Sequence, residues 1–464
     1  ILPGPYRVPA YRSIGHFRLT NKTPAATYRS PGRYETTFVR ERLIDAIAHE
    51  LCMDPNEVRR RNAITQEEMP YHRPLEALGE EIEYDSGDYC GLLDKLLAAV
   101  EWEKLNADLA RRRAEGEAVG AGFAMFVEKS GLGPMDGVRI EIDASGLIEL
   151  ITGGASLGQG FETAMAQVCA EILGIDYRRV RVIHGQTDRI QYGIGAHASR
   201  ATVMTASATH NGALKLRTKA IEVAAELMQT SAAALDIADG NVVHNDRLAG
   251  ASVSLGEIAA YLAPTSKMLA GREPGLRAEG WFHTQHQVYP YGIHLAVVKV
   301  DRDTGEVRIE RYVIAYDIGR AINPALVRGQ IVGGFAQGLG GALFEEFTYN
   351  DDGDPLATTF ADYLMPTLRE IPEIEVMLQE DHPTPLNPLG IKGTGESGTT
   401  GVGAAVASAI DQAIGIPDAV TQLPITPQRL RQILRGRTRN LPLPEREQMH
   451  SRPKAKTSSA EIPD

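Results

Sequence analysis

Apolar residues recur at helical spacing between residues 36 and 64. A face that returns every three or four positions is typical of an amphipathic helix, which in a globular protein turns that face toward a core. The members of this face are Leu43, Ile44, Ile47, Ala48 and Leu51. We predict a helix here, in the clearest helical region of the chain.

Two more helices and a tail are predicted from local signals. The sequence DPNE makes Asp54 the N-cap of a short helix, with Pro55 in its first turn and Glu57 in the capping-box position. The charge-rich stretch from Glu101 to Glu117 predicts a solvated helix that connects two lobes. Residues 436–464 are rich in Pro, Lys, Ser and Glu, which predicts a disordered tail.

Two later segments share one plan. Val138–Gly153 and Ala296–Gly319 each predict two strands joined by a short turn that contains glycine. Each is followed by a glutamine between small residues and then by a helical pattern, in GQGFETAMAQVCAEILG and GGFAQGLGGALFEE. In the first helix Gly174 is the expected C-cap. We interpret this as a weak internal duplication and predict an α+β fold of two lobes, each a hairpin followed by a helix.

Composition narrows the class of protein. The 464 residues leave room for two to four domains. Lys and Arg number 48 and Asp and Glu 60, and the net charge of −12 argues against nucleic-acid or anionic-membrane binding. No apolar run approaches the ~18 residues of a membrane span. The chain starts at Ile1 without a signal stretch, so we expect a fragment, a processed product or half of a split polypeptide.

The metal-ligating residue types are scattered. Cys52, Cys90 and Cys169 are too far apart for a disulfide framework or for a cysteine-ligated zinc or iron–sulfur site in this chain. This usage predicts a reducing, cytoplasmic compartment. His283 and His286 have no supporting carboxylate nearby in sequence, so we interpret them as ordinary polar positions. Any redox centre has to come from a cofactor or a partner.

The sequence GIKGTGESGTTG raises two interpretations. Gly393, Gly395 and Gly398 spell G-x-G-x-x-G, but three prolines precede them, which is incompatible with the central strand of a Rossmann site. Ser397 lacks the frame of a hydrolase nucleophile. Either the glycines let the backbone pass close to a ligand while presenting Glu396 to it, or the loop is a helix N-terminus whose dipole Glu396 complements.

Two other loops have a similar composition. Gly153–Gly160, with Gln159, precedes a helix, and its backbone N–H groups suit a phosphate or an oxo group. The stretch from His197 to Gly212 places several hydroxyls on a short path, on Ser199, Thr202, Thr205 and Ser207. Such loops are individually often turns and caps. Three of them, each before a helix, exceed what chance predicts.

Four ordered motifs resemble one known family. They are TNKTPAATYRSPGRYETTFVRERLIDAIAHELCMDPNEVRRRN, GGASLGQGFETAMAQVCAEILGI, DIGRAINPALVRGQIVGGFAQGLGGALFEE and NPLGIKGTGESGTTG. Together they resemble the large molybdenum-binding subunit of the xanthine dehydrogenase family. The family includes aldehyde oxidoreductases, aerobic carbon monoxide dehydrogenases and N-heterocycle hydroxylases. The resemblance spans nearly the whole chain up to the tail.

The resemblance implies roles for particular residues. Glu396 matches the family's general base beside molybdenum, and Arg29 lies on the loop that flanks the metal and the substrate. Gln159 matches the glutamine that hydrogen-bonds an oxo ligand, and Gln337 matches a second glutamine that contacts the pterin. Further cofactor contacts are expected at Leu157, Gly158, Gly160, Thr205, Ser207 and Gly395. No side chain is expected to ligate molybdenum, which the pterin would hold.

The loop around Arg29 distinguishes members of the family. Copper-containing carbon monoxide dehydrogenases have a cysteine in a YRCSFR loop, whereas this chain has YRSPGR, with Ser30 in the cysteine position. A hydroxyl is a poor ligand for Cu(I), which prefers thiolate. We therefore expect no copper.

The resemblance also predicts activity, domains and partners. It implies a hydroxylase that oxidises an electron-poor carbon of an aldehyde or N-heterocycle, with molybdopterin cytosine dinucleotide as cofactor. Residues 1–115 would be the end of the first cofactor-binding domain with a connecting helix, and residues 116–435 the second domain. The family's N-terminal half is missing from this chain, so a complementary polypeptide is expected, with [2Fe-2S] and FAD subunits as electron acceptors. A non-catalytic cofactor-binding or assembly module is the alternative, and substrate identity stays open.

Overall fold

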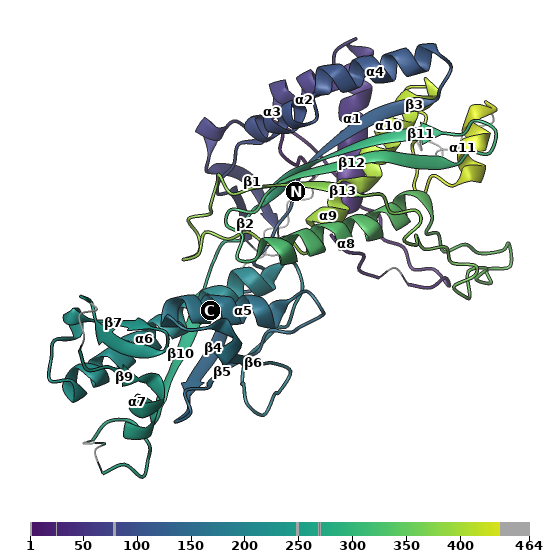
Figure 1. The fold of residues 1–464 in the computed structure, drawn as a ribbon. Coiled ribbons are helices and arrows are strands. Elements are labelled where there is room, and N and C mark those ends of the chain that lie inside the picture. The colour runs from purple at the N-terminus through teal and green to yellow at the C-terminus, as the bar shows by residue number, and fades with distance from the viewer. Residues whose placement is uncertain are drawn as a thin grey trace, which may run out of the picture.

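The chain forms two lobes, each built on a four-stranded β-sheet (Figure 1). The computed structural model describes residues 2–24, 26–77, 80–246, 250–267, 269 and 271–436. We call the described part of 135–283 the small lobe and the other described residues the large lobe. Apart from Gly436, the predicted disordered tail lies outside the described residues. No helix in the described part is both long and apolar enough to cross a membrane.

The large sheet contains one of the two predicted hairpins. β11 (Tyr291–Val300) and β12 (Val307–Asp317) pair antiparallel, and α8 (Pro324–Leu343) follows them. β13 (Ile374–Gln379) then pairs parallel with β12. β3 (Val119–Val127) completes the sheet as the edge strand beside β11.

The small sheet repeats this plan. β4 (Met135–Ile142) and β5 (Ile148–Thr152) form the second predicted hairpin, followed by α5 (Phe161–Leu173) and by β6 (Val180–Ile183), which is parallel to β5. β10 (Leu276–His283) pairs with β4. Both sheets therefore have the order hairpin, crossover helix and parallel strand. The predicted α+β fold of two hairpin-then-helix lobes is confirmed.

Helices cover both sheets. In the large lobe the other elements are α1 (Arg33–Glu50), α2 (Pro55–Asn62), β1 (Tyr71–Ala77), β2 (Glu80–Tyr84), α3 (Tyr89–Ala99), α4 (Trp102–Ala114), α9 (Ser397–Thr400), α10 (Val402–Ile414) and α11 (Pro427–Leu434). In the small lobe they are a π-helical turn (Ala201–Ala206), α6 (Ser207–Leu227), β7 (Leu235–Ala238), β8 (Asn241–His244), β9 (Val253–Ser254) and α7 (Leu255–Tyr261). Short 3₁₀ turns lie at Gln66–Glu68, Tyr177–Arg179 and Ala232–Ala234. α8 and α10 pack on one face of the large sheet and α3 and α4 on the other, while α5 and α6 cover the small sheet.

Local capping follows the sequence signals closely. The Asp54 carboxylate accepts hydrogen bonds from the N–H groups of Asn56 and Glu57, which confirms Asp54 as the N-cap of α2. The predicted capping box is not formed, because the Glu57 carboxylate accepts a hydrogen bond from Arg61 at 2.6 Å and not from the N–H of Asp54. Gly174 ends α5 with a left-handed φ of 58°. Capping depends on neighbours in sequence, which is why it is predictable.

The helix predicted between the lobes belongs to one lobe. α4 is solvated on its outer side as expected, but Trp102 packs edge-on against Phe123 of the large sheet, with ring centroids 4.9 Å apart. α4 therefore does not connect the lobes. The chain passes between them in the segments 128–134 and 284–290. The predicted domain boundary at residues 115/116 does not separate the two lobes, because α1–α4 pack on the sheet that contains β3. The division of the chain into two cofactor-binding domains at this position stays a prediction.

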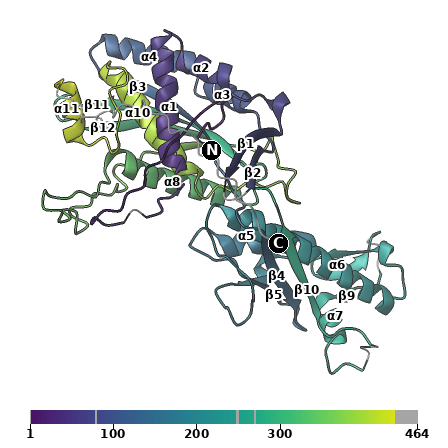
Figure 2. The same cartoon turned by 180° about the vertical axis from the view of Figure 1, so that it is seen from behind.

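α1 turns its predicted core face outward. Leu43, Ile47 and Leu51 are exposed, and of the predicted face only Ala48 is fully buried. The inner side contains Arg33, Tyr34, Thr37, Arg40 and Glu41. Seen from behind, α1 lies over α10 and the large sheet (Figure 2). The prediction of a helix was correct, but the prediction of its buried face was wrong, because charged groups and not aliphatic ones occupy the buried side.

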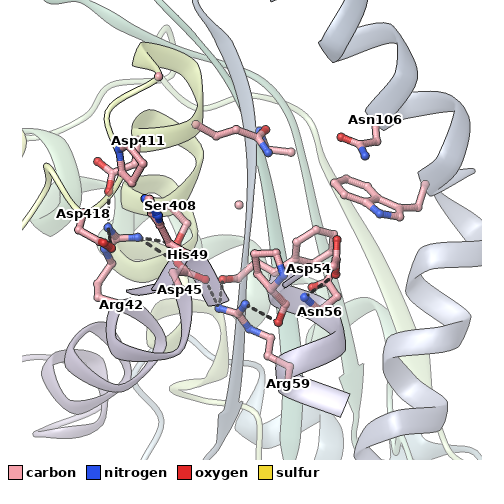
Figure 3. Close-up of a pocket in the computed structure, with 18 residues that line it drawn as sticks. Arg42, Asp45, His49, Asp54, Asn56, Arg59, Asn106, Ser408, Asp411 and Asp418 are labelled. Atoms are coloured by element: carbon pink, nitrogen blue, oxygen red, sulfur yellow. Dashed lines mark hydrogen bonds and ion pairs between the residues drawn. The ribbon is translucent and has the colours of Figure 1, made fainter. Parts of the chain in front are cut away.

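A polar cavity lies next to this buried side. It has a volume of about 390 Å³ and is bounded by α1, α2, α4, α10 and the edge of β3 (Figure 3). Its two arginines are paired: Arg42 contacts Asp45 and Asp411, and Arg59 contacts Asp45 at 2.9 Å. None of the site residues predicted from the sequence lines this cavity.

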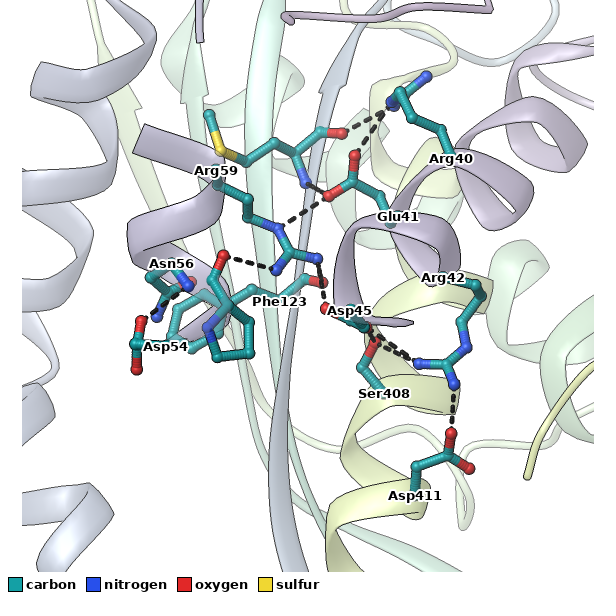
Figure 4. Close-up of polar contacts among 12 residues, drawn as sticks. Arg40, Glu41, Arg42, Asp45, Asp54, Asn56, Arg59, Phe123, Ser408 and Asp411 are labelled. Atoms are coloured by element: carbon teal, nitrogen blue, oxygen red, sulfur yellow. Dashed lines mark hydrogen bonds and ion pairs between the residues drawn. The ribbon is translucent and has the colours of Figure 1, made fainter. Parts of the chain in front are cut away.

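A buried ion cluster attaches α1 to the edge of β3. The Glu41 carboxylate accepts hydrogen bonds from Arg40 and Arg59 and from the N–H of Met125, each at 3.0 Å (Figure 4). Arg59 also donates to the carbonyl of Phe123 at 3.1 Å. An edge strand exposes unpaired N–H and C=O groups. Here the side chains of α1 and α2 satisfy several of them.

We predict that Arg59→Ala lowers the free energy of unfolding by roughly 3–5 kcal/mol, because it leaves the buried carboxylate of Glu41 with one cation fewer. Urea unfolding measures the change. Arg61→Ala is the matched control, since the exposed Arg61–Glu57 pair is expected to contribute no more than about 1 kcal/mol. Equal losses in the two variants would contradict a structural role for the cluster.

Candidate functional site

Glu396 lies where the two lobes meet. Its carboxylate accepts a hydrogen bond from Nη2 of Arg33, on α1, at 3.1 Å. The other oxygen accepts one from the hydroxyl of Ser199, in the small lobe, at 2.9 Å. The side chain is only 11% exposed. Two segments that are far apart in sequence therefore fix both carboxylate oxygens.

The helix-dipole interpretation of Glu396 fits these contacts poorly. Glu396 is the N-cap residue of α9, but its side chain makes no capping hydrogen bond. α9 has only four residues, so its dipole is small. The contacts with Arg33 and Ser199 favour a carboxylate that is held in place for another purpose.

The glycines of this loop allow close packing within the protein. A Cβ at Gly393 would lie 2.3 Å from the carbonyl oxygen of Ser199, and one at Gly398 would lie 2.0 Å from that of Ile331 on α8. At these two positions the backbone of the loop passes close to the backbone of other segments of the protein. At Gly395 the nearest atom would be the Ser199 hydroxyl, at 3.1 Å.

Arg29 clamps the same loop onto α8. Its Nε donates to the carbonyl of Gly395 at 2.5 Å, and its Nη2 donates to the carbonyl of Gln330 at 3.2 Å and to the side-chain Oε1 of Gln330 at 3.1 Å. Burial lowers the pKa of Arg29, and the nearby carboxylate of Glu396 partly offsets this decrease. The structure thus brings three of the predicted residues together: Arg29, Gly395 and Glu396.

The Gly153–Gly160 loop reaches α8 from the small lobe. Gly158 and Gly160 have φ values of 91° and 82°, and a Cβ at Gly160 would lie 2.4 Å from Leu326 of α8. The Gln159 amide donates to the carbonyl of Ala155 at 2.9 Å, and its oxygen accepts from the N–H of Leu157. Gln159 therefore braces its own loop, and Leu157 is exposed.

α8 positions these parts relative to one another. Leu326 touches the Gly153–Gly160 loop and Ile331 touches Gly398, and five residues of helix separate them by roughly 7.5 Å. Gln337 is half-buried about 9 Å further along. Its carbonyl accepts a hydrogen bond from the hydroxyl of Tyr28. One helix therefore aligns the glycine loop, the Glu396 loop and Gln337.

Two predicted hydroxyls have partners inside the small lobe. Thr205 donates to Asp136 at 2.6 Å, and Ser207 donates to the carbonyl of Val203 at 2.6 Å. Both residues are fully buried. Asp136 is also paired with Arg200 at 3.3 Å. These bonds anchor the segment that bears Ser199, and the structure does not bring either hydroxyl to Glu396.

Sequence reasoning singled out Ser199 as one hydroxyl of its loop but did not connect Ser199 or Arg33 with Glu396. Arg33 also contacts Glu128, whose carboxylate accepts hydrogen bonds from Ser30 at 2.8 Å and Thr400 at 3.2 Å. Burial raises the pKa of Glu128, while Arg33 lowers it. One guanidinium thus contacts two carboxylates, and the guanidinium of Arg29 also lies near Glu396. Arg33 stands in the YRSPGR stretch, but no periodicity connects it to residues 128 or 396.

A neutral histidine, His294, contacts the backbone of the Glu396 loop. The ring nitrogens of His294 lie 2.9 Å from the hydroxyl of Tyr312 and 3.2 Å from the carbonyl of Ser397. Burial lowers the pKa of His294 to about 3. The residue after Glu396 is therefore held by a group that stays uncharged near neutral pH.

The site suits an anionic organic cofactor better than a metal ion bound by side chains. Among the described residues no group of three or more His, Cys, Asp and Glu is placed to hold a metal. The Gly153–Gly160 loop precedes the 13-residue α5, and the Cβ position of Gly158 faces open space. Uncovered backbone at a helix N-terminus fits a phosphate-bearing group.

The fold and this site define a molybdopterin-binding protein. Residues 95–372 match the family described as molybdopterin cofactor-binding domain, and residues 1–63 match a second family of the same description. The first match covers more than half of the chain. The chain therefore belongs to the molybdopterin cofactor-binding domain family, and the resemblance to molybdenum-binding large subunits is confirmed.

Particular relatives place the chain more closely. It is 40% identical over 432 residues to the 6-hydroxypseudooxynicotine dehydrogenase complex subunit gamma of Paenarthrobacter nicotinovorans, covering 93% of this chain and 54% of the relative. The structure of quinoline 2-oxidoreductase from Pseudomonas putida 86 is similar, with a TM-score of 0.82 and 31% identity over 94% of this chain and 56% of the other. The structure of the Cu,Mo-CO dehydrogenase is similar with a TM-score of 0.79 and 30% sequence identity, and the match covers 88% of this chain and 52% of the other. The chain thus spans about half the length of the relatives it matches.

We predict that acid destabilises the protein partly through His294. Its pKa is depressed in the folded state, so the stability it contributes is present above about pH 6.5 and is lost as the pH falls toward 3. The free energy of unfolding should fall by up to about 1.4 kcal/mol per pH unit from this one proton. His294→Gln should flatten that slope in urea titrations at several pH values. An unaltered slope in His294→Gln would contradict the prediction.

Proposed function

We propose that this chain is the cofactor-binding part of a molybdenum hydroxylase and that Glu396 is its general base. The observation that supports this most is the carboxylate of Glu396, which Arg33 and Ser199 hold between the lobes through both of its oxygens. A carboxylate that is held in position in this way can act as a general base. The relatives, which are hydroxylases and dehydrogenases, agree with this chemistry.

When bound, the cofactor would supply the redox chemistry. The protein's part is to bind, orient and accept a proton. Arg29 keeps the Glu396 loop against α8, and Ser199 orients the carboxylate from the opposite lobe. A proton taken from the reacting water would pass to an oxygen of Glu396, and Arg33 would hold the carboxylate in position before the transfer.

The remaining predicted residues form the proposed cradle of the cofactor. Gln159 has to exchange its bonds to Ala155 and Leu157 for a bond to the cofactor, which is a change of rotamer and not of fold. Backbone groups of Leu157, Gly158 and Gly160 would face the phosphate-bearing part. Thr205 and Ser207 would act through the loops they anchor, and Gln337 would contact the pterin from α8.

The finer identity of the cofactor also belongs to this proposal. We infer a cytosine dinucleotide form without copper. Ser30 supports the absence of copper, because its hydroxyl is fully buried and bonded to Glu128 and Thr400, and hydroxyls bind Cu(I) weakly. The Cu,Mo-CO dehydrogenase shares the fold, so the fold alone does not decide this.

The whole enzyme is proposed to be larger than this chain. A polypeptide equivalent to the unmatched part of the relatives, a [2Fe-2S] subunit and an FAD subunit would complete it, and an aldehyde or N-heterocycle would be the substrate. The sparse cysteines favour a cytoplasmic location.

Glu396→Gln tests the base. In the assembled enzyme it should reduce turnover at least roughly 10²-fold, because general-base catalysis contributes about 10²–10⁴-fold and the amide has no basic oxygen. Molybdenum content should stay near the wild-type value, since the amide has the same volume and can still accept from Arg33. Glu35→Gln, at an exposed position of the first turn of α1, is the control. Normal turnover with full molybdenum would remove Glu396 from the mechanism.

Gln159→Ala tests the cradle. Loss of this side chain should weaken cofactor retention by about 1–3 kcal/mol, the typical cost of leaving a buried polar partner unpaired. Molybdenum and cytosine nucleotide released from the purified complex measure retention. Unchanged content together with unchanged turnover would show that Gln159 only braces its loop.

A further inference from the structure

The outer face of α1 exposes a row of aliphatic side chains. Val39, Leu43, Ile47 and, just after the helix, Leu51 recur every four residues and are each between 45% and 59% exposed. Only the ends of the row, near Glu35 and Glu50, are charged. Single exposed aliphatic residues are common on proteins, but contiguous rows mark interaction surfaces.

The charged cluster prevents α1 from burying this row by rotating. Arg40 donates to the carbonyl of Met125 at 2.8 Å, and Glu41 accepts from the N–H of the same residue. Arg33, two turns earlier on the same side, contacts Glu128 and Glu396. Turning the outer face inward would break all of these contacts at once. The exposure of the row is therefore built into the fold.

The relatives supply a candidate to cover this face. The alignment with the 40%-identical gamma subunit covers 93% of this chain but only 54% of that relative. Nearly half of the relative therefore has no counterpart in this chain. α1 starts at Arg33 in the candidate site and runs outward for 18 residues, or roughly 27 Å. A polypeptide that lies along it would also reach the site.

We propose that the outer face of α1 is the docking surface for the polypeptide equivalent to the unmatched part of these relatives, whichever chain provides it. This rests on the proposed function. The partner would present an apolar surface to Val39, Leu43, Ile47 and Leu51. Its docking would bring further residues next to Arg33 and Glu396.

The chain contains a natural reporter for this contact. Cys52 is exposed and directly follows Leu51, whereas Cys90 is half-buried and Cys169 is buried. In the assembled complex the rate of maleimide modification of Cys52, followed by peptide mass spectrometry, should fall at least tenfold below its rate in the isolated chain. A cysteine introduced at Leu214, which is 43% exposed on α6, should react equally fast in both.

Substitution provides the second arm. The tagged counterpart polypeptide from the same source, recognised by its alignment to the unmatched part of the gamma subunit, is co-expressed with wild-type chain, Leu43→Glu or Leu214→Glu. Leu43→Glu should weaken association at least tenfold, because it places a charge in a desolvated apolar contact. Leu214→Glu, at a leucine of the other lobe that is 43% exposed against 58% for Leu43, should bind like the wild type.

Each outcome decides a different point. Association with Cys52 still reactive and Leu43→Glu unaffected would overturn the docking face but leave the proposed function standing. No association of the wild-type chain would overturn both. Concentration-dependent dimers of the isolated chain that Leu43→Glu abolishes would show that a second copy is the occupant and would also overturn the proposal.

Discussion

The buried carboxylate of Glu41 determines how α1 sits on the large sheet. It is completely shielded from water and is bonded to Arg40, Arg59 and the N–H of Met125 at the free edge of β3. A charge at such a position persists only with its partners in place, so the cluster forms as a unit or not at all. Its geometry sets the rotation of α1, which in turn directs Arg33 toward Glu396 and the aliphatic row toward the outside.

The candidate site depends on that rotation and on the meeting of the lobes. Arg33 arrives from α1, Ser199 from the small lobe and Glu396 from the loop packed on α8. Each lobe folds around its own sheet and has its own apolar core. The site has no sheet or apolar core of its own. It consists of side chains from both lobes, which meet only when the lobes are correctly placed against each other. That makes it adjustable without disturbing the cores, and it also makes it sensitive to whatever covers α1.

Much of the fold could be predicted, and so could part of the site. The hairpins at β4–β5 and β11–β12, the helices after them and the caps at Asp54 and Gly174 follow from residues close in sequence. Motif resemblance singled out Glu396 and Gln159. It could not show that Thr205 and Ser207 bond inside the small lobe, since both hydroxyl-rich turns and ligand-binding loops have that composition.

By itself, the sequence determined the local elements and the family, and its motifs singled out Glu396. Those depend on spacing, capping and short motifs, which act over a few residues. The tertiary structure alone decided which face of α1 is buried and which groups hold Glu396. The partners are remote: Glu41 and Met125 are 84 positions apart, and Arg33 and Glu396 are 363 apart. Hydrophobic periodicity indicates that a helix has two faces, but when a buried charge finds enough partners elsewhere in the fold, those partners decide which face turns inward.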